Sequence, residues 1–189
     1  MTVRSEVIDM NLPNKITLFR VIMVPFFVAF LLLQEYVPGG KWIAFTIFIV
    51  ASLSDAVDGK IARKYNLVTD FGKFMDPLAD KLLVCSAMIG LIELGKMPAW
   101  IVIIIIAREF TISGFRLIAS DNGKVIAASM WGKVKTTVQM VMVVVMIADI
   151  QLTAFRYIEA VLMYAALILT VVSLIDYLVK NKNVIETYK

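Results

Sequence analysis

Six long apolar runs dominate this chain and restrict it to a bundle of membrane-crossing helices. Each run is close to the roughly 20 residues that an α-helix needs to cross a hydrocarbon core about 30 Å thick. The sequence lacks the ten-residue alternating segments that a membrane β-barrel requires. It therefore predicts an all-α integral membrane protein with six transmembrane helices, forming a single domain over residues 1–189. The runs lie near residues 16–34, 42–57, 77–94, 98–119, 125–148 and 157–179.

The basic residues predict how this bundle is oriented. If both termini are cytoplasmic, only Lys41, Lys96 and Arg156 of the nineteen Lys and Arg fall on the outer side. Cytoplasmic loops of membrane proteins carry such an excess of positive charge. We therefore expect a multi-pass protein of the cell membrane with cytoplasmic N- and C-termini. Residues 1–14 are expected to add a short helix lying in the membrane interface.

Four carboxylates are predicted to lie within the cytoplasmic half of this bundle. At about 1.5 Å per residue from Lys41, Asp55 is about 21 Å along the second helix. Asp58 follows at i+3 on the same helical face, and Asp76 and Asp80 share one face of the third helix at i and i+4. The third helix runs back from the cytoplasmic boundary, so the two acid pairs reach a similar depth.

Four buried carboxylates need compensation, because each buried charge costs on the order of 2.5–3.5 kcal/mol even on the insertion scale. Lys60 and Arg63 cannot neutralise all four. Carboxylate oxygens favour Mg²⁺, Mn²⁺ or Ca²⁺, whereas a chain with no His and one Cys is a poor zinc ligand. The sequence thus predicts one or two divalent cations. Metal and basic residues at a membrane face indicate phosphate chemistry.

The same residues carry a resemblance to a known family. The spacing Asp55-x2-Asp58-Gly59-x2-Ala62-Arg63-x8-Gly72-x3-Asp76-x3-Asp80 resembles, at every fixed position, the signature of the CDP-alcohol phosphotransferases. Members of that family are membrane enzymes, usually homodimers. They use Mg²⁺ or Mn²⁺ to displace CMP from a CDP-linked lipid or alcohol with a second alcohol.

The resemblance implies roles for individual residues. It implies that Asp55, Asp58 and Asp76 bind the metal, with Asp80 close to it and acting as the catalytic base. It also implies that the metal ions held by these carboxylates bind the donor pyrophosphate, which counts Asp55 and Asp58 among the CDP-diacylglycerol-binding residues. The remaining donor-binding residues implied are Gly59, Ala62, Arg63 and Gly72 around the cytidine. Thr17 and Arg20 lie near the inner end of the first predicted helix, and we expect them to border the nucleotide, with an ordinary interfacial anchor as the alternative.

Flanking segments narrow the substrates that the resemblance implies. The stretches NLPNKITLFRVIMVPFF at 11–27, AREFTISGFRLIAS at 107–120 and VIAASMWGKVKT at 125–136 resemble members that use CDP-diacylglycerol and sn-glycerol 3-phosphate. A dianionic acceptor phosphate needs a cluster of cations, and arginine can bind it in a bidentate manner through two parallel hydrogen bonds. The residues expected to bind it are Arg108, Arg116, Lys133 and Lys135.

Several alternatives remain open at this stage. The basic cluster could simply follow from the positive-inside rule. A sibling enzyme could use inositol phosphate, serine or phosphatidylglycerol as its acceptor. The four acids could instead line a divalent-cation transport path, although that would spread them along the membrane normal and place broken helices in two matching halves. An inactive relative is disfavoured by the intact aspartates. No nucleic-acid partner is expected.

Overall fold

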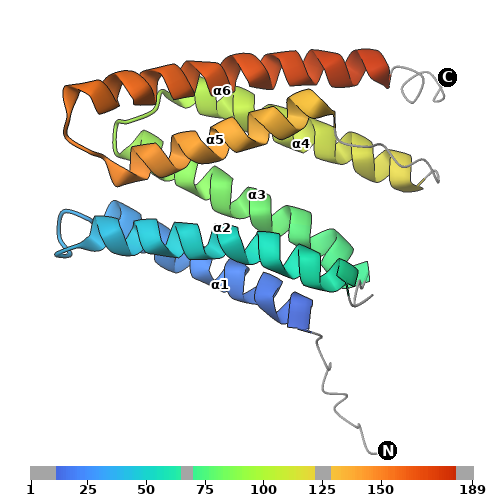
Figure 1. Cartoon of the computed structure of the whole chain (residues 1–189), viewed down its shortest axis with the longest axis horizontal. Helices are drawn as coiled ribbons and strands as arrows, with labels where there is room; N and C mark the ends of the chain where they lie inside the picture. The colour runs from blue at the N-terminus through green and yellow to red at the C-terminus, as the bar shows by residue number, and fades with distance from the viewer. Residues whose placement is uncertain (1–11, 65–69, 122–128, 182–189) are drawn as a thin grey trace, which may run out of the picture. The chain divides into compact units, whose positions relative to one another are not determined.

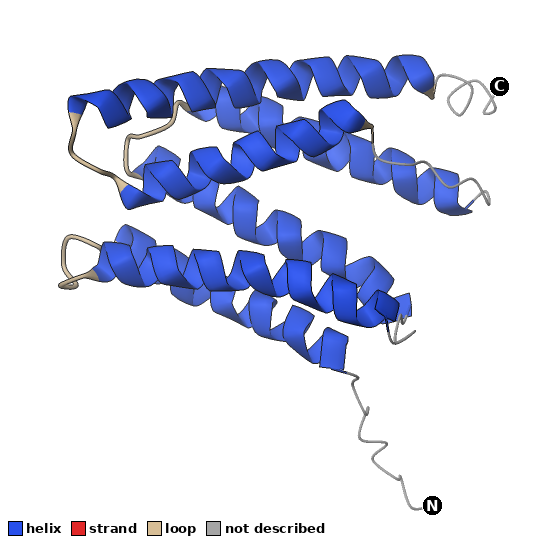
Figure 2. Cartoon of the chain, viewed as in Figure 1, coloured by secondary structure: helices blue, strands red, loops and turns tan. Residues whose placement is uncertain are grey.

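The described chain consists of helices joined by short turns (Figures 1 and 2). The computed structural model describes residues 12–64, 70–121 and 129–181, and within this part of the chain there is no strand. This confirms the predicted all-α class. The helices are α1 (Leu12–Leu32), α2 (Gly40–Lys64), α3 (Asp70–Glu93), α4 (Ala99–Asp121), α5 (Met130–Ala148) and α6 (Thr153–Lys180).

The chain divides into two compact units. The first runs to Leu83 and holds α1, α2 and the first part of α3. The second begins at Val84 and holds the rest of α3 together with α4, α5 and α6.

In the first unit α1 packs along α2 (Figure 1). The buried positions of α1 recur every three or four residues, which is the repeat of one helical face. Phe27 on this face meets Phe48 of α2, with ring centroids 5.5 Å apart and planes inclined by 46°. The buried residues are Asn14, Thr17, Arg20, Val24, Phe27 and Leu31 on α1, and Gly40, Ala44, Phe48 and Ala51 on α2.

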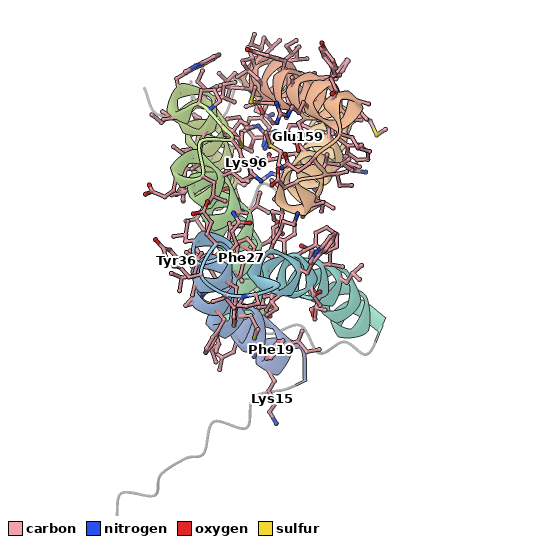
Figure 3. All side chains as sticks on the ribbon, turned by 90° about the vertical axis from the view of Figure 1, so that its left-hand side faces the viewer. Lys15, Phe19, Phe27, Tyr36, Lys96 and Glu159 are labelled. Carbon is pink, nitrogen blue, oxygen red and sulfur yellow. The ribbon has the colours of Figure 1, made fainter. Side chains whose placement is uncertain are left out.

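In the second unit α6 packs against both α5 and α4. One end of this unit is fastened by Lys96, whose Nζ lies 3.0 Å from Asp149 Oδ1 and donates to the Met146 carbonyl at 3.2 Å. Asp149 ends α5 in a left-handed conformation with φ +45°. A cation at this position also suits the negative end of the helix dipole. Figure 3 shows Glu159 of α6 beside Lys96.

The helix ends differ from the apolar runs in an informative way. Hydropathy alone would end the second run at residue 57 and begin the third at 77, but α2 continues to Lys64 and α3 begins at Asp70. These extensions carry all the signature residues except Asp55 and Asp80, which lie within the apolar runs. Within the run predicted from residue 125, α5 begins at Met130, because Ser129 is extended (φ −69°, ψ 157°) and caps the helix.

Three of the described helices are long and apolar enough to cross a membrane: Asn14–Leu32, Met130–Ala148 and Thr153–Lys180. The apolar part of α2, Gly40–Ser54, is shorter. The number of crossings and their orientation thus remain predictions. The predicted interfacial helix over residues 1–14 falls mostly outside the described residues, since α1 is described only from Leu12.

Candidate functional site

The signature aspartates lie on the polar ends of two helices. Asp55 and Asp58 are on α2, and Asp76 and Asp80 are on α3. Of these four side chains only Asp80 is described: it is half-buried and makes polar or charged contacts. No group of three or more potential metal-ligating side chains gathers among the described residues. The side chains of the other predicted donor and metal residues (Asp55, Asp58, Gly59, Ala62, Arg63, Gly72 and Asp76) lie outside the described part.

Thr17 and Arg20 are placed by α1 on its buried face. Thr17 is 1% exposed and Arg20 is completely buried. Both take part in polar or charged interactions. A buried guanidinium is costly unless it is paired, so burial of this kind on the face that packs against α2 favours a role beyond interfacial anchoring.

A groove lies between the start of α1 and the later part of α2, at the end of their contact away from the turn that joins them. Its volume is about 460 Å³, and Lys15 and Phe19 at the start of α1 form part of its wall (Figure 3). Ser54, directly before Asp55, lies in the same wall. The lining is almost entirely apolar and is completed by Ile16, Val50 and Leu53. Such a lining is suited to an alkyl chain.

In the second unit Arg108 is a buried cation held by two helices. Its Nε donates to Ser173 Oγ of α6 at 3.1 Å, and its Nη1 donates to Glu109 Oε1 at 3.0 Å. Its Nη2 lies 3.5 Å from the position that a Cβ on Gly132 would occupy. Arg108 is 8% exposed. Two of its three nitrogens are thereby fixed, and the third faces the first turn of α5.

Lys135 of α5 completes this cluster. Its side chain is 1% exposed, and its ammonium forms a short ion pair with Glu109 Oε1. One carboxylate oxygen therefore accepts from two cations that belong to different helices. We refer to Arg108, Glu109 and Lys135 as the buried triad.

Arg116 and Lys133 differ from the buried pair in being exposed. Arg116 lies near the Tyr177 hydroxyl, which Arg108 also approaches. Tyr177 is 4% exposed, and its hydroxyl has no hydrogen-bond partner among the described residues. The structure therefore brings Arg108 and Lys135 together through Glu109, whereas it places Arg116 and Lys133 on the surface of the same unit.

The start of α5 adds a further positive element. Ser129 caps the helix, its Oγ accepting from the Gly132 amide at 3.2 Å. The first amide groups of a helix carry partial positive charge and favour anions. Because Arg108 Nη2 faces this same turn, the arrangement is chemically suited to a phosphate.

Sequence reasoning did not assign roles to Glu109, Ser173 or Tyr177. Glu109 follows Arg108 directly, yet its contact with Lys135 depends on how α4 and α5 both pack against α6. Ser173 and Tyr177 stand at i and i+4 on α6, so they share a face. Two polar residues on one face of an otherwise apolar helix were the sequence feature that could have indicated a role for this pair.

Comparison with known proteins identifies the relatives of this chain. The CDP-alcohol phosphatidyltransferase family matches residues 10–172. The CDP-diacylglycerol–glycerol-3-phosphate 3-phosphatidyltransferase of Bacillus subtilis is 43% identical, over 94% of this chain and 98% of its own length. The enzyme of the same name from Haemophilus influenzae is 41% identical over 89% and 91%, respectively.

A probable phosphatidylglycerophosphate synthase of Mycobacterium tuberculosis is 40% identical, over 90% of this chain and 81% of its own length. The family match covers the greater part of the sequence and includes the whole of the signature. The chain belongs to the CDP-alcohol phosphatidyltransferase family.

Proposed function

We propose that this protein transfers the phosphatidyl group of CDP-diacylglycerol to sn-glycerol 3-phosphate, yielding phosphatidylglycerophosphate and CMP. The observation that carries the proposal is the similarity, at 40–43% identity over about nine-tenths of the chain, to enzymes named for this reaction or its product. The buried triad supports the acceptor assignment, because it supplies a fixed, partly desolvated cationic site of the kind that a phosphate requires.

The donor is assigned to α2 and α3. Four aspartates at i, i+3 and i, i+4 spacing offer only hard oxygen ligands, a donor set that fits Mg²⁺ or Mn²⁺. We assign Asp55, Asp58, Asp76 and Asp80 to one or two ions. A bound cation would offset the charge of the pyrophosphate and stabilise the departing CMP. Gly59, Ala62, Arg63 and Gly72 are assigned to the cytidine part of the donor.

The register of α1 against α2 supports including Thr17 and Arg20 in the donor site. Counting equally from Phe27 and Phe48 in opposite chain directions pairs Val24 with Ala51, and all four of these residues are buried. The same count brings position 20 to the level of 55 and position 17 to the level of 58. Arg20 and Thr17 are thus assigned to the nucleotide end of the donor.

The chemical step is a direct displacement at phosphorus. The primary hydroxyl of the acceptor attacks the phosphorus that bears diacylglycerol, the bond to the CMP oxygen breaks, and Asp80 takes the hydroxyl proton. Positioning and charge neutralisation supply most of the acceleration in such transfers. Asp80→Asn should then lower kcat severely while CDP-diacylglycerol is still bound.

The proposal includes the placement of the protein in the membrane. Six crossings with cytoplasmic termini put the acids and the basic residues at the cytoplasmic face, where a water-soluble acceptor arrives. The enzyme is further proposed to be a homodimer in the cell membrane. Labelling of single cysteines at Lys41 and Lys180 from either side of sealed vesicles tests the orientation, which requires opposite sides for the two positions.

The function is tested with purified protein, CDP-diacylglycerol and Mg²⁺, by following CMP release with each candidate acceptor in turn. Glycerol 3-phosphate should support release, whereas inositol phosphate, serine and phosphatidylglycerol should not. Preference for one of those three would show that the protein uses the acceptor of another enzyme in the family and not glycerol 3-phosphate. Metal uptake into vesicles without any CMP release would instead favour a cation transporter.

A further inference from the structure

We propose that Glu109 is a positioning residue for the acceptor phosphate: its carboxylate holds Arg108 and Lys135 in the arrangement that binds the phosphate. This inference rests on the proposed function, since it concerns the acceptor site of that reaction. Glu109 is negatively charged, as the phosphate is. A search for residues of opposite charge to the phosphate would therefore not identify it.

The geometry gives Glu109 a different task from the cations beside it. Its Oε1 accepts from Arg108 Nη1 at 3.0 Å and also forms the short ion pair with Lys135. The Lys135 and Glu109 side chains are 1% and 17% exposed. A single oxygen shared between α4 and α5 fixes the separation of two flexible side chains before any substrate arrives. Preorganisation of this kind lowers the cost of ordering them on binding.

The charge balance explains how an acid helps an anion site. Arg108 and Lys135 carry two positive charges, and Glu109 carries one negative charge, so the triad keeps a net positive charge. Without Glu109 two like charges would face each other in a buried setting, where their repulsion is weakly screened. The carboxylate of Asp176 on α6 pairs with Lys180 at 2.6 Å and also interacts with the Ser129 side chain, so its negative charge lies near the first turn of α5 and is balanced in part by Lys180.

The bonds within the triad leave a defined donor for the ligand. Arg108 Nε is bound to Ser173 and Nη1 to Glu109, while Nη2 faces the first turn of α5 beside Gly132. Ser173 and Glu109 thus hold the guanidinium at two of its three nitrogens, and Nη2 is left directed towards the first turn of α5. Loss of Glu109 would free the plane of the guanidinium to rotate away from that turn.

An ion pair that serves folding alone would have the same contacts, so the test must separate stability from acceptor use. Glu109→Gln keeps the size of the side chain and removes its charge. In the full-length protein, KM for glycerol 3-phosphate should rise about 10-fold or more, the equivalent of one charge-assisted contact. KM for CDP-diacylglycerol should stay within about 2-fold. Asp149→Asn, which weakens the Lys96 ion pair in the same unit, is the control and should leave both KM values unchanged.

A double-mutant cycle with Lys135→Met shows whether Glu109 acts through its partner. Positioning predicts that Glu109→Gln raises acceptor KM at least about 3-fold less in the Lys135→Met background than in the wild type, since contacting residues are not additive. Additive effects, or a lower thermal stability with unchanged acceptor KM, would overturn the inference. If Glu109→Gln is not recovered folded, Glu109→Asp must shift acceptor KM in the same direction. Wild-type turnover with glycerol 3-phosphate tests the proposed function separately, because the inference depends only on variant-to-wild-type ratios.

Discussion

Arg108 on α4 donates from Nε to the Ser173 hydroxyl on α6 across a 3.1 Å hydrogen bond. Ser173 is fully buried, and its hydroxyl also donates to the Thr170 carbonyl at 3.0 Å. The Ser173 hydroxyl therefore links the Arg108 guanidinium to a backbone carbonyl of α6. This bond fixes one end of Arg108, as Glu109 fixes the other.

The first prediction follows from that bond. Ser173→Ala leaves a buried guanidinium nitrogen without its acceptor, which should cost about 1–3 kcal/mol of stability and raise acceptor KM. Thr170→Val is the matched control, because Thr170 is equally buried one turn away and its hydroxyl donates to the Ala166 carbonyl in its own helix. Thermal unfolding in detergent and kinetics for both substrates provide the measurement. Equal acceptor KM values for the two variants would show that Ser173 has no role in binding the acceptor.

A second prediction separates the buried cations from the exposed ones. Arg108→Ala and Lys135→Ala each remove a desolvated contact worth roughly 1.5–3 kcal/mol, so acceptor KM should rise about 10- to 150-fold. Arg116→Ala and Lys133→Ala should have smaller effects, because exposed charges are screened by solvent. Arg108→Lys should also be impaired, since an ammonium cannot replace the planar guanidinium.

These four variants also decide whether the basic residues bind substrate at all. Donor KM should remain nearly unchanged throughout, and plain glycerol should be a poor acceptor for the intact enzyme. Normal acceptor KM in all four would mean that the residues serve only membrane topology.

A third prediction uses the glycine at the start of α5. An alanine Cβ at Gly132 would lie 3.5 Å from Arg108 Nη2 and 3.6 Å from Ser129 Oγ, which are ordinary contacts, so Gly132→Ala should fold normally. A phosphate bound to Nη2 would then be crowded, and overpacking of order 1 kcal/mol or more would raise acceptor KM at least about fivefold. Gly114→Ala on α4 is the control, because nothing lies within 4 Å of its added Cβ. Equal kinetics for the two variants would place the phosphate elsewhere.

A fourth prediction concerns the metal. Chelation with EDTA should abolish CMP release, and Mg²⁺ or Mn²⁺ should restore it, because carboxylates alone would repel a pyrophosphate. Asp58→Asn should be inactive while the protein still inserts into the membrane. Full turnover in the presence of chelator would contradict a metal-dependent mechanism.

The helices were predictable because a membrane span needs a long apolar run, and all six runs coincide with helices. The ends were less accessible to hydropathy. α2 and α3 continue through the charged residues of the signature, and the start of α5 depends on the cap formed by Ser129. Helix ends are decided by local hydrogen bonds, which a hydropathy window does not report.

The basic residues of the candidate site were predictable in kind but not in environment. Arg108 and Lys135 are buried, whereas Arg116 and Lys133 are exposed, although all four occur in similar sequence surroundings. The positive-inside rule produces the same residue types without any ligand. The role of Glu109 could not be inferred because its second contact, with Lys135, joins residues 26 positions apart. Only the packing of both α4 and α5 against α6 reveals it.

The central claim is the identity of the acceptor, and one comparison tests it most directly. Purified protein receives CDP-diacylglycerol and Mg²⁺ with either sn-glycerol 3-phosphate or glycerol, and CMP and the lipid product are measured together. The account predicts equal amounts of CMP and phosphatidylglycerophosphate with glycerol 3-phosphate, and very little of either CMP or phosphatidylglycerol with glycerol. Comparable turnover with both acceptors, or none with glycerol 3-phosphate, would contradict it.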